Sequence, residues 1–139
     1  MAVAIRIHQS HVDAMVAHAL EEAPLECCGI IGARDGTVTG VYRAKNREAS
    51  PYRFSIDPLE TRRIGEQIED EASVMAGFYH SHTGSGAIPS PTDIRMMGPL
   101  FGPPFVHFLV GVADREQPVV RCWYIVDGDR TEQEFEVVD

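Results

Sequence analysis

Two histidines and an aspartate stand at a spacing that could hold a metal ion. His80 and His82 are separated by one residue, and Asp93 follows after a loop that contains glycine, serine and proline. Side chains alternate between the two faces of a β-strand, so both imidazoles would point the same way. Gly84 and Gly86 would help the loop bring Asp93 back to them. Two histidines and a carboxylate leave one tetrahedral position of a zinc ion open for water, which is typical of a catalytic site.

A zinc hydrolase also needs a carboxylate that takes a proton from water and passes it to the leaving amine. Three glutamates precede the apolar run from residue 27 to 33, namely Glu21, Glu22 and Glu26. Glu21 and Glu22 fall at the expected C-terminus of a helix, where the helix dipole disfavours a carboxylate. Glu26 opens a buried strand and could face the histidines of a neighbouring strand. The local pattern favours Glu26 without excluding the other two.

Simpler interpretations of the same residues stay open. Ser90 and Asp93 fit a helix-capping pattern that needs no metal, and a His-x-His pair at a strand end can be incidental. His107 lies in the apolar run FVHFLV and is expected to be a hydrogen-bonded core residue. Cys27 and Cys28 are expected to be small buried hydrophobic residues, with a nucleophilic Cys28 as the alternative.

The elements that would position these residues are short strands and helices in mixed order. The histidines end an apolar strand from Ser73 to His82, and Ser90 begins a short helix that ends near Gly98. Asp57 and Pro58 begin a longer helix that runs to about Asp70. Further strands are expected from Tyr52 to Ile56 and, as the last element, from Thr131 to Val138. About seven strands and three helices predict an α/β protein, with a mixed, mostly antiparallel sheet flanked by helices.

Composition limits the class of protein. The chain has 139 residues, 44% of them hydrophobic, which fits one domain spanning residues 1–139. The net charge of −9 argues against binding of this protein to nucleic acid or to an anionic membrane surface. The first ten residues lack the features of a signal peptide, so we expect a cytoplasmic protein. Three cysteines without regular spacing do not suggest a disulfide framework.

The chemistry-bearing residues resemble the motif of a known family. His80, Ser81 and His82, followed by seven residues, Ser90, two residues and Asp93, match the H-[ST]-H-x7-S-x-x-D motif of the JAMM (MPN+) metalloproteases. The preceding segment that begins at Glu26, ECCG, resembles the E-x-C-G segment of the same family. The resemblance implies the MPN/JAMM fold, an α-β sandwich of the cytidine-deaminase-like type.

The resemblance also implies roles for single residues. It implies one Zn²⁺ per chain held by His80, His82 and Asp93, with Glu26 as the general acid/base. Ser90 would donate a hydrogen bond to the oxyanion of the tetrahedral intermediate. If Ser90 also caps the helix, the two roles would compete for one hydroxyl group. Ser81 would support the strand or the residues around the metal.

Looser likenesses bear on the substrate. HVDAMVAHA, Asn46 with Ser50-Pro51-Tyr52, YHSHT, PSPTD and YIVDG are similar to short bacterial members that release cysteine from a sulfur-carrier protein. This implies, as the substrate, a ubiquitin-like sulfur-carrier protein with a C-terminal Gly-Gly, in cysteine biosynthesis. Trimming of C-terminal extensions, cleavage of isopeptide bonds and a non-catalytic MPN-type scaffold are the alternatives. The oligomeric state is left open, with a homodimer as one option, as is ordering of residues 83–89 on substrate binding.

Overall fold

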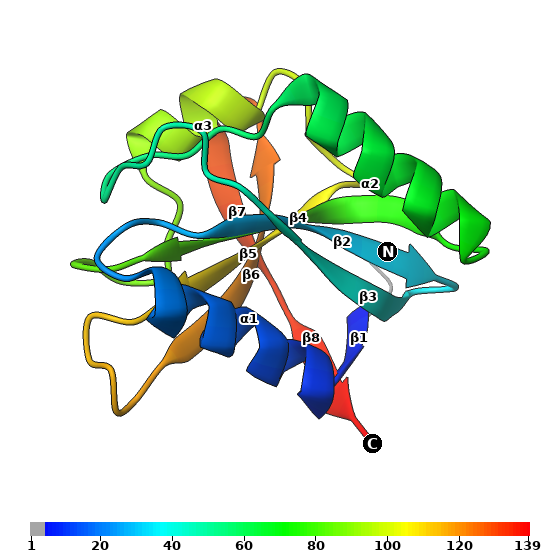
Figure 1. The fold of residues 1–139 in the computed structure, drawn as a ribbon, viewed down its shortest axis with the longest axis horizontal. Coiled ribbons are helices and arrows are strands. Elements are labelled where there is room, and N and C mark those ends of the chain that lie inside the picture. Colours follow the sequence, from blue (N-terminus) through cyan, green and yellow to red (C-terminus); the bar gives the residue numbers. More distant parts are fainter. Residues whose placement is uncertain (1–4) are drawn as a thin grey trace.

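The computed structural model describes residues 5–139 and has three layers. A sheet of eight strands lies in the middle, with helix α1 (Gln9–Glu22) on one face (Figure 1). Helices α2 (Pro58–Asp70) and α3 (Pro91–Met97) lie on the other face. The strands are β1 Ile5–His8, β2 Cys28–Arg34, β3 Thr37–Ala44, β4 Val74–His82, β5 Val106–Gly111, β6 Val119–Val126, β7 Asp129–Gln133 and β8 Phe135–Val138.

The sheet is mixed, as expected for this α/β class. The strand order is β7-β6-β5-β4-β2-β3-β1-β8. Pairing is antiparallel for β2–β3, β2–β4, β5–β6 and β6–β7, and parallel for β1–β3, β1–β8 and β4–β5. Strand β4, which carries the two histidines, is therefore central and has a hydrogen-bonded neighbour on each side. Its pairing with β2 sets Cys28 opposite His80.

Each face of the sheet has its own hydrophobic core. Tyr79 belongs to the core beneath α1, which also contains Met15 and Phe108. Phe78 belongs to the core beneath α2 and α3, together with Ile68. Because side chains alternate along β4, the histidines at positions 80 and 82 lie on the Phe78 face. They point toward the layer that contains α3, which carries the predicted third ligand.

Two sequence-based predictions of strands were wrong. The segment from Tyr52 to Ile56 is a loop, because its backbone carbonyls accept hydrogen bonds from the nearby residues Asn46 and Arg47 and join no strand of the sheet. The last strand is interrupted at Glu134. Its first half, β7, pairs with β6 and its second half, β8, pairs with β1 at the opposite edge. A twisted, curled sheet brings its two edges close enough for one residue to connect them.

Within residues 5–139, no helix is long and apolar enough to cross a lipid bilayer. The longest helix, α1, has 14 residues, whereas a membrane-spanning helix needs about 20 apolar ones.

Candidate metal centre and active site

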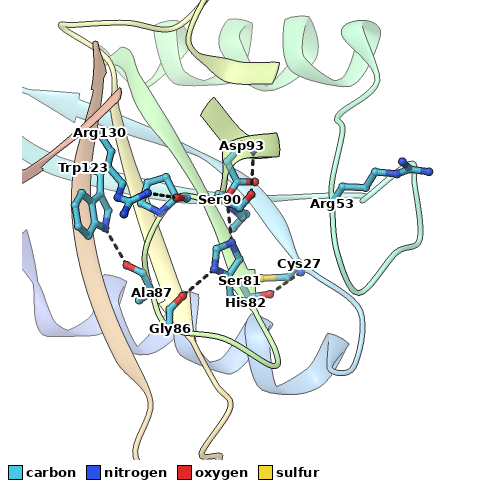
Figure 2. Close-up of polar contacts among 12 residues, drawn as sticks. Cys27, Arg53, Ser81, His82, Gly86, Ala87, Ser90, Asp93, Trp123 and Arg130 are labelled. Carbon is cyan, nitrogen blue, oxygen red and sulfur yellow. Dashed lines mark hydrogen bonds and ion pairs between the residues drawn. The ribbon is translucent and has the colours of Figure 1, made fainter. Parts of the chain in front are cut away.

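Three buried side chains meet where β4 ends and α3 begins. His80, His82 and Asp93 are 2%, 5% and 3% exposed. The Nε2 atoms of His80 and His82 each lie 3.0 Å from Oδ2 of Asp93. Within the described residues they form the one group of His, Cys, Asp and Glu side chains whose ligand atoms could hold a metal, all within 4.8 Å of one another. Figure 2 shows Asp93 above His82, beside the loop that connects them.

The state of the imidazole nitrogens fits a metal ion. Both ring nitrogens of His80 are buried: Nδ1 has no hydrogen-bond partner among the described residues, and Nε2 contacts Oδ2 of Asp93 at 3.0 Å without the geometry of a hydrogen bond. A buried polar atom without a partner is destabilising unless something else satisfies it. Nδ1 of His82 lies 2.8 Å from the carbonyl oxygen of Gly86, to which it donates (Figure 2). This bond directs the Nε2 lone pair toward the metal position, as is common for histidine ligands. The donor set therefore suits zinc.

Asp93 is held in place by its own helix. A capping box joins it to Ser90: the Asp93 amide donates to Oγ of Ser90 at 3.1 Å, and Oδ2 of Asp93 accepts from the Ser90 amide at 2.9 Å. Burial alone would raise the pKa of Asp93. The nearby imidazoles, His80 foremost, and the hydrogen bond from the Ser90 amide outweigh burial and hold that pKa well below its usual range. The carboxylate is therefore ionised, as a metal ligand must be.

The capping box also answers whether the two roles expected of Ser90 compete. As a cap, Oγ of Ser90 accepts a hydrogen bond, which uses a lone pair. A serine hydroxyl has a second lone pair and one proton to donate. The proton stays free for a substrate oxygen, so the expected competition does not arise.

Glu26 lies beside the histidines because of strand register. Cys28 is opposite His80 in the antiparallel pair, so Glu26 is level with His82. Glu26 is 3% exposed, and it lines a groove of about 540 Å³ together with His82, Ser90 and Tyr52. Burial, with repulsion from Asp93, raises the pKa of Glu26 to about 8, although His82 opposes the rise. A carboxyl group that exchanges its proton near neutral pH is suited to general acid/base chemistry.

The other two glutamates are away from this groove. Glu21 and Glu22 are exposed at the end of α1, and Glu21 forms an ion pair with Arg43. Neither lines the groove that contains His82 and Ser90.

The remaining candidate residues are buried, and their contacts indicate a role in the fold. Oγ of Ser81 accepts a hydrogen bond from the Cys27 amide at 2.8 Å, which connects β4 to the chain beside Glu26. The buried Cys27 has its pKa raised to about 11 by burial, and burial likewise raises the pKa of Cys28. Both cysteines are therefore thiols and poor nucleophiles. His107 is a core residue, as predicted, and its Nε2 donates to the Phe101 carbonyl at 2.9 Å.

Sequence reasoning missed the anchors of the loop at residues 83–89. Nε1 of Trp123 donates to the Ala87 carbonyl at 2.9 Å, and Arg130 donates to the Pro89 carbonyl at 3.3 Å (Figure 2). Both anchors come from the far end of the chain, so local spacing could not reveal them. It also missed Phe54, whose ring stacks on His80 with centroids 4.4 Å apart.

Comparisons with known proteins agree with this geometry. The chain is 35% identical over 131 residues to the CysO-cysteine peptidase of Mycobacterium tuberculosis (strain H37Rv), covering 92% of this chain and 87% of that protein. It is 41% identical over 88 residues to the desampylase of Haloferax volcanii, covering 58% of this chain and 63% of that protein. The solution structure of DSY2949 from Desulfitobacterium hafniense is similar with a TM-score of 0.86 and 31% identity, covering 97% and 93% of the two chains.

The family described as prokaryotic homologs of the JAB domain matches residues 8–126, which include the histidines, Asp93, Ser90 and Glu26. The chain belongs to this family, the prokaryotic JAB-domain homologs, and is a hydrolase of the JAMM metalloprotease type.

Proposed function

We propose that this protein is a zinc-dependent peptidase that cleaves the amide bond between the C-terminal glycine of a ubiquitin-like sulfur-carrier protein and an attached cysteine. The observation that carries the proposal is the buried set of His80, His82 and Asp93, with Glu26 beside it in one groove. Similarity to a CysO-cysteine peptidase over 92% of the chain supports this substrate. We further propose that residues 1–139 act as one domain, in the cytoplasm.

The metal would be held by the two histidine Nε2 atoms and the Asp93 carboxylate. When bound there, Zn²⁺ would lower the pKa of a water molecule to about 7 and polarise the scissile carbonyl. His82 is kept in the required tautomer by the Gly86 carbonyl. Asp93 is oriented by the capping box, and the neighbouring histidines help to keep it ionised.

Glu26 would move the proton. Its carboxylate takes a proton from the attacking water and gives it to the leaving amine as the C–N bond breaks. The water oxygen remains on the glycine carboxyl group, and cysteine leaves with a free amine. Ser90 donates its hydroxyl proton to the developing oxyanion, while its oxygen still caps α3. These roles need the three groups in one groove, which Glu26, His82 and Ser90 share.

A second candidate keeps the chemistry and changes the bond. The protein could remove ubiquitin-like modifiers from lysine side chains or trim C-terminal extensions. The 41% identity to a desampylase over 88 residues favours this candidate. In either reaction the bond that is hydrolysed is an amide formed by a carbonyl group of the carrier, so the same residues would act.

The test is intact mass spectrometry of a Gly-Gly-ended carrier bearing C-terminal cysteine, incubated with the zinc-loaded protein. We expect the carrier to lose one cysteine, and a chelator to block the loss. A lysine-linked carrier and a C-terminally extended carrier serve as the competing substrates. Cleavage of either of these with an unchanged cysteine adduct would overturn the proposed substrate. If the zinc-loaded protein cleaves none of the three carriers, the proposed peptidase activity is overturned.

Glu26→Gln tests the proposed mechanism. It should keep its zinc, because Glu26 is not a ligand, and lose about 10²- to 10⁴-fold in rate. Asp93→Ala should lose the metal itself. Retention of most activity by Glu26→Gln would remove Glu26 from the mechanism.

A further inference from the structure

The side chain of Asn46 uses its full hydrogen-bonding capacity just after β3. Nδ2 donates to the carbonyl oxygens of Glu26 at 3.0 Å and Arg53 at 3.1 Å. Oδ1 accepts from the amides of Glu48 at 3.0 Å and Ser55 at 3.3 Å. An asparagine side chain has two donors and two lone pairs, and all four are engaged here. Asn46 therefore connects the loop of residues 46–55 to the backbone of Glu26.

Glu26 is held by this loop on both sides of its backbone. Its carbonyl accepts from Asn46, and its amide donates to the Ser50 carbonyl at 2.9 Å. Strand β2 begins two residues later, at Cys28. Glu26 thus lies outside the strand, and its backbone hydrogen bonds go to the loop instead.

The same loop forms part of the active-site wall. Tyr52 lines the groove together with Glu26 and His82. Phe54 stacks on the metal ligand His80. The side chain of Arg53 points away from the metal ligands (Figure 2), so Arg53 takes part in this arrangement through its backbone carbonyl.

We propose that Asn46 is a positioning residue for the general acid/base. It fixes the Glu26 backbone relative to the groove that Glu26 shares with His82, and it does so without contacting substrate. The inference rests on the proposed role of Glu26. Because a displacement of about 1 Å at a reacting group can lower the rate about 100-fold, loss of the Asn46 donors should be visible in kcat.

The test compares three variants of the zinc-loaded protein. Asn46→Asp keeps the shape and the acceptor but replaces the donor with an oxygen facing two carbonyls. Asn46→Ala removes the amide without adding charge. Ser55→Ala is the matched control, because it loses a hydrogen bond within the same loop, from Oγ to Glu48 at 3.0 Å. It leaves the contacts of Asn46 and Glu26 in place.

Two measurements are made on each variant: kcat and KM per zinc-loaded, folded molecule, and hydrogen exchange of the Glu26 amide. Both Asn46 variants should lower kcat about 10- to 100-fold with little change in KM, and speed exchange of the Glu26 amide. Ser55→Ala should change neither. Zinc content should be the same in all of them.

The inference is overturned if the Glu26 amide exchanges at the same rate in both Asn46 variants, or if exchange rises and kcat per folded molecule does not fall. A loss of kcat in Asn46→Asp alone would assign the effect to the added charge and also overturn it. Should wild-type protein cleave the lysine-linked or extended carrier instead of the cysteine adduct, only the proposed substrate fails. The comparison is then made on the cleaved carrier.

Discussion

Ser90 gives the sharpest test of the site, because one hydroxyl group is assigned two separate jobs. Its oxygen accepts from the Asp93 amide at 3.1 Å, and its proton is free for the substrate oxyanion. Ser90→Ala removes both. Loss of a serine cap destabilises a protein by about 1 kcal/mol, whereas loss of one oxyanion donor lowers kcat by about 10²- to 10³-fold.

These magnitudes show which effect would dominate. Against a stability of about 5–15 kcal/mol, a loss of about 1 kcal/mol leaves nearly all molecules folded. Destabilisation therefore cannot explain a hundredfold loss of rate. Ser90→Gly separates the two jobs, because glycine at an N-cap costs only a few tenths of a kcal/mol, yet it also lacks the hydroxyl.

The assay combines urea unfolding with steady-state release of cysteine at matched zinc content. We expect Ser90→Ala and Ser90→Gly to lose the same factor in kcat, while only the alanine variant loses stability clearly. Ser90→Thr, which keeps a hydroxyl, should keep most of both. If Ser90→Ala retained kcat within about threefold of wild type, Ser90 would be a helix cap and no more.

Four further predictions concern stability. Gly29→Ala should destabilise the protein by about 3 kcal/mol or more, measured by urea unfolding, because its Cβ would lie 2.1 Å from the Tyr79 ring. The same Cβ would lie 2.5 Å from the backbone carbonyl oxygen of Tyr42, so a mild effect would show that both the ring and this backbone can move. Ser81→Ala should lower the free energy of unfolding by about 1–3 kcal/mol, since the buried Cys27 amide loses its acceptor. Burial and Arg43 lower the pKa of His18 below its ordinary value of 6.5. The fold therefore binds fewer protons there than the unfolded chain, and stability should fall as the pH drops below about 6.5. A His18→Gln variant should show a shallower fall, and an equal fall would assign the effect elsewhere. Zinc at about 100 times its Kd should stabilise the wild type by about 2.7 kcal/mol in thermal or urea unfolding. The same addition should leave Asp93→Ala unchanged.

The candidate metal site was the part of this protein most accessible from sequence. The spacing of His80, His82 and Asp93 depends on one strand and one helix cap, both of which are local features. The helix α2, which is defined by local signals, was also predicted closely.

The features that local sequence patterns did not predict depend on contacts between segments that are distant in the sequence. Tyr52 to Ile56 has the composition of a strand, but its carbonyl oxygens accept hydrogen bonds from the nearby residues Asn46 and Arg47. Among the three glutamates, the β2–β4 register favours Glu26, because it sets Cys28 opposite His80, a residue 52 positions later in the chain. The anchoring of residues 83–89 by Trp123 likewise depends on how the sheet is assembled.

The interrupted final strand has a consequence for synthesis of the protein. β7 and β8 finish opposite edges of the sheet, and β8 pairs with β1, which is the first strand of the fold. The sheet therefore cannot close until residues 129–138 have left the ribosome. A nascent chain that has not yet reached residue 129 lacks β7 and β8. It presents β6 and β1 as two open edges, each able to pair with another chain.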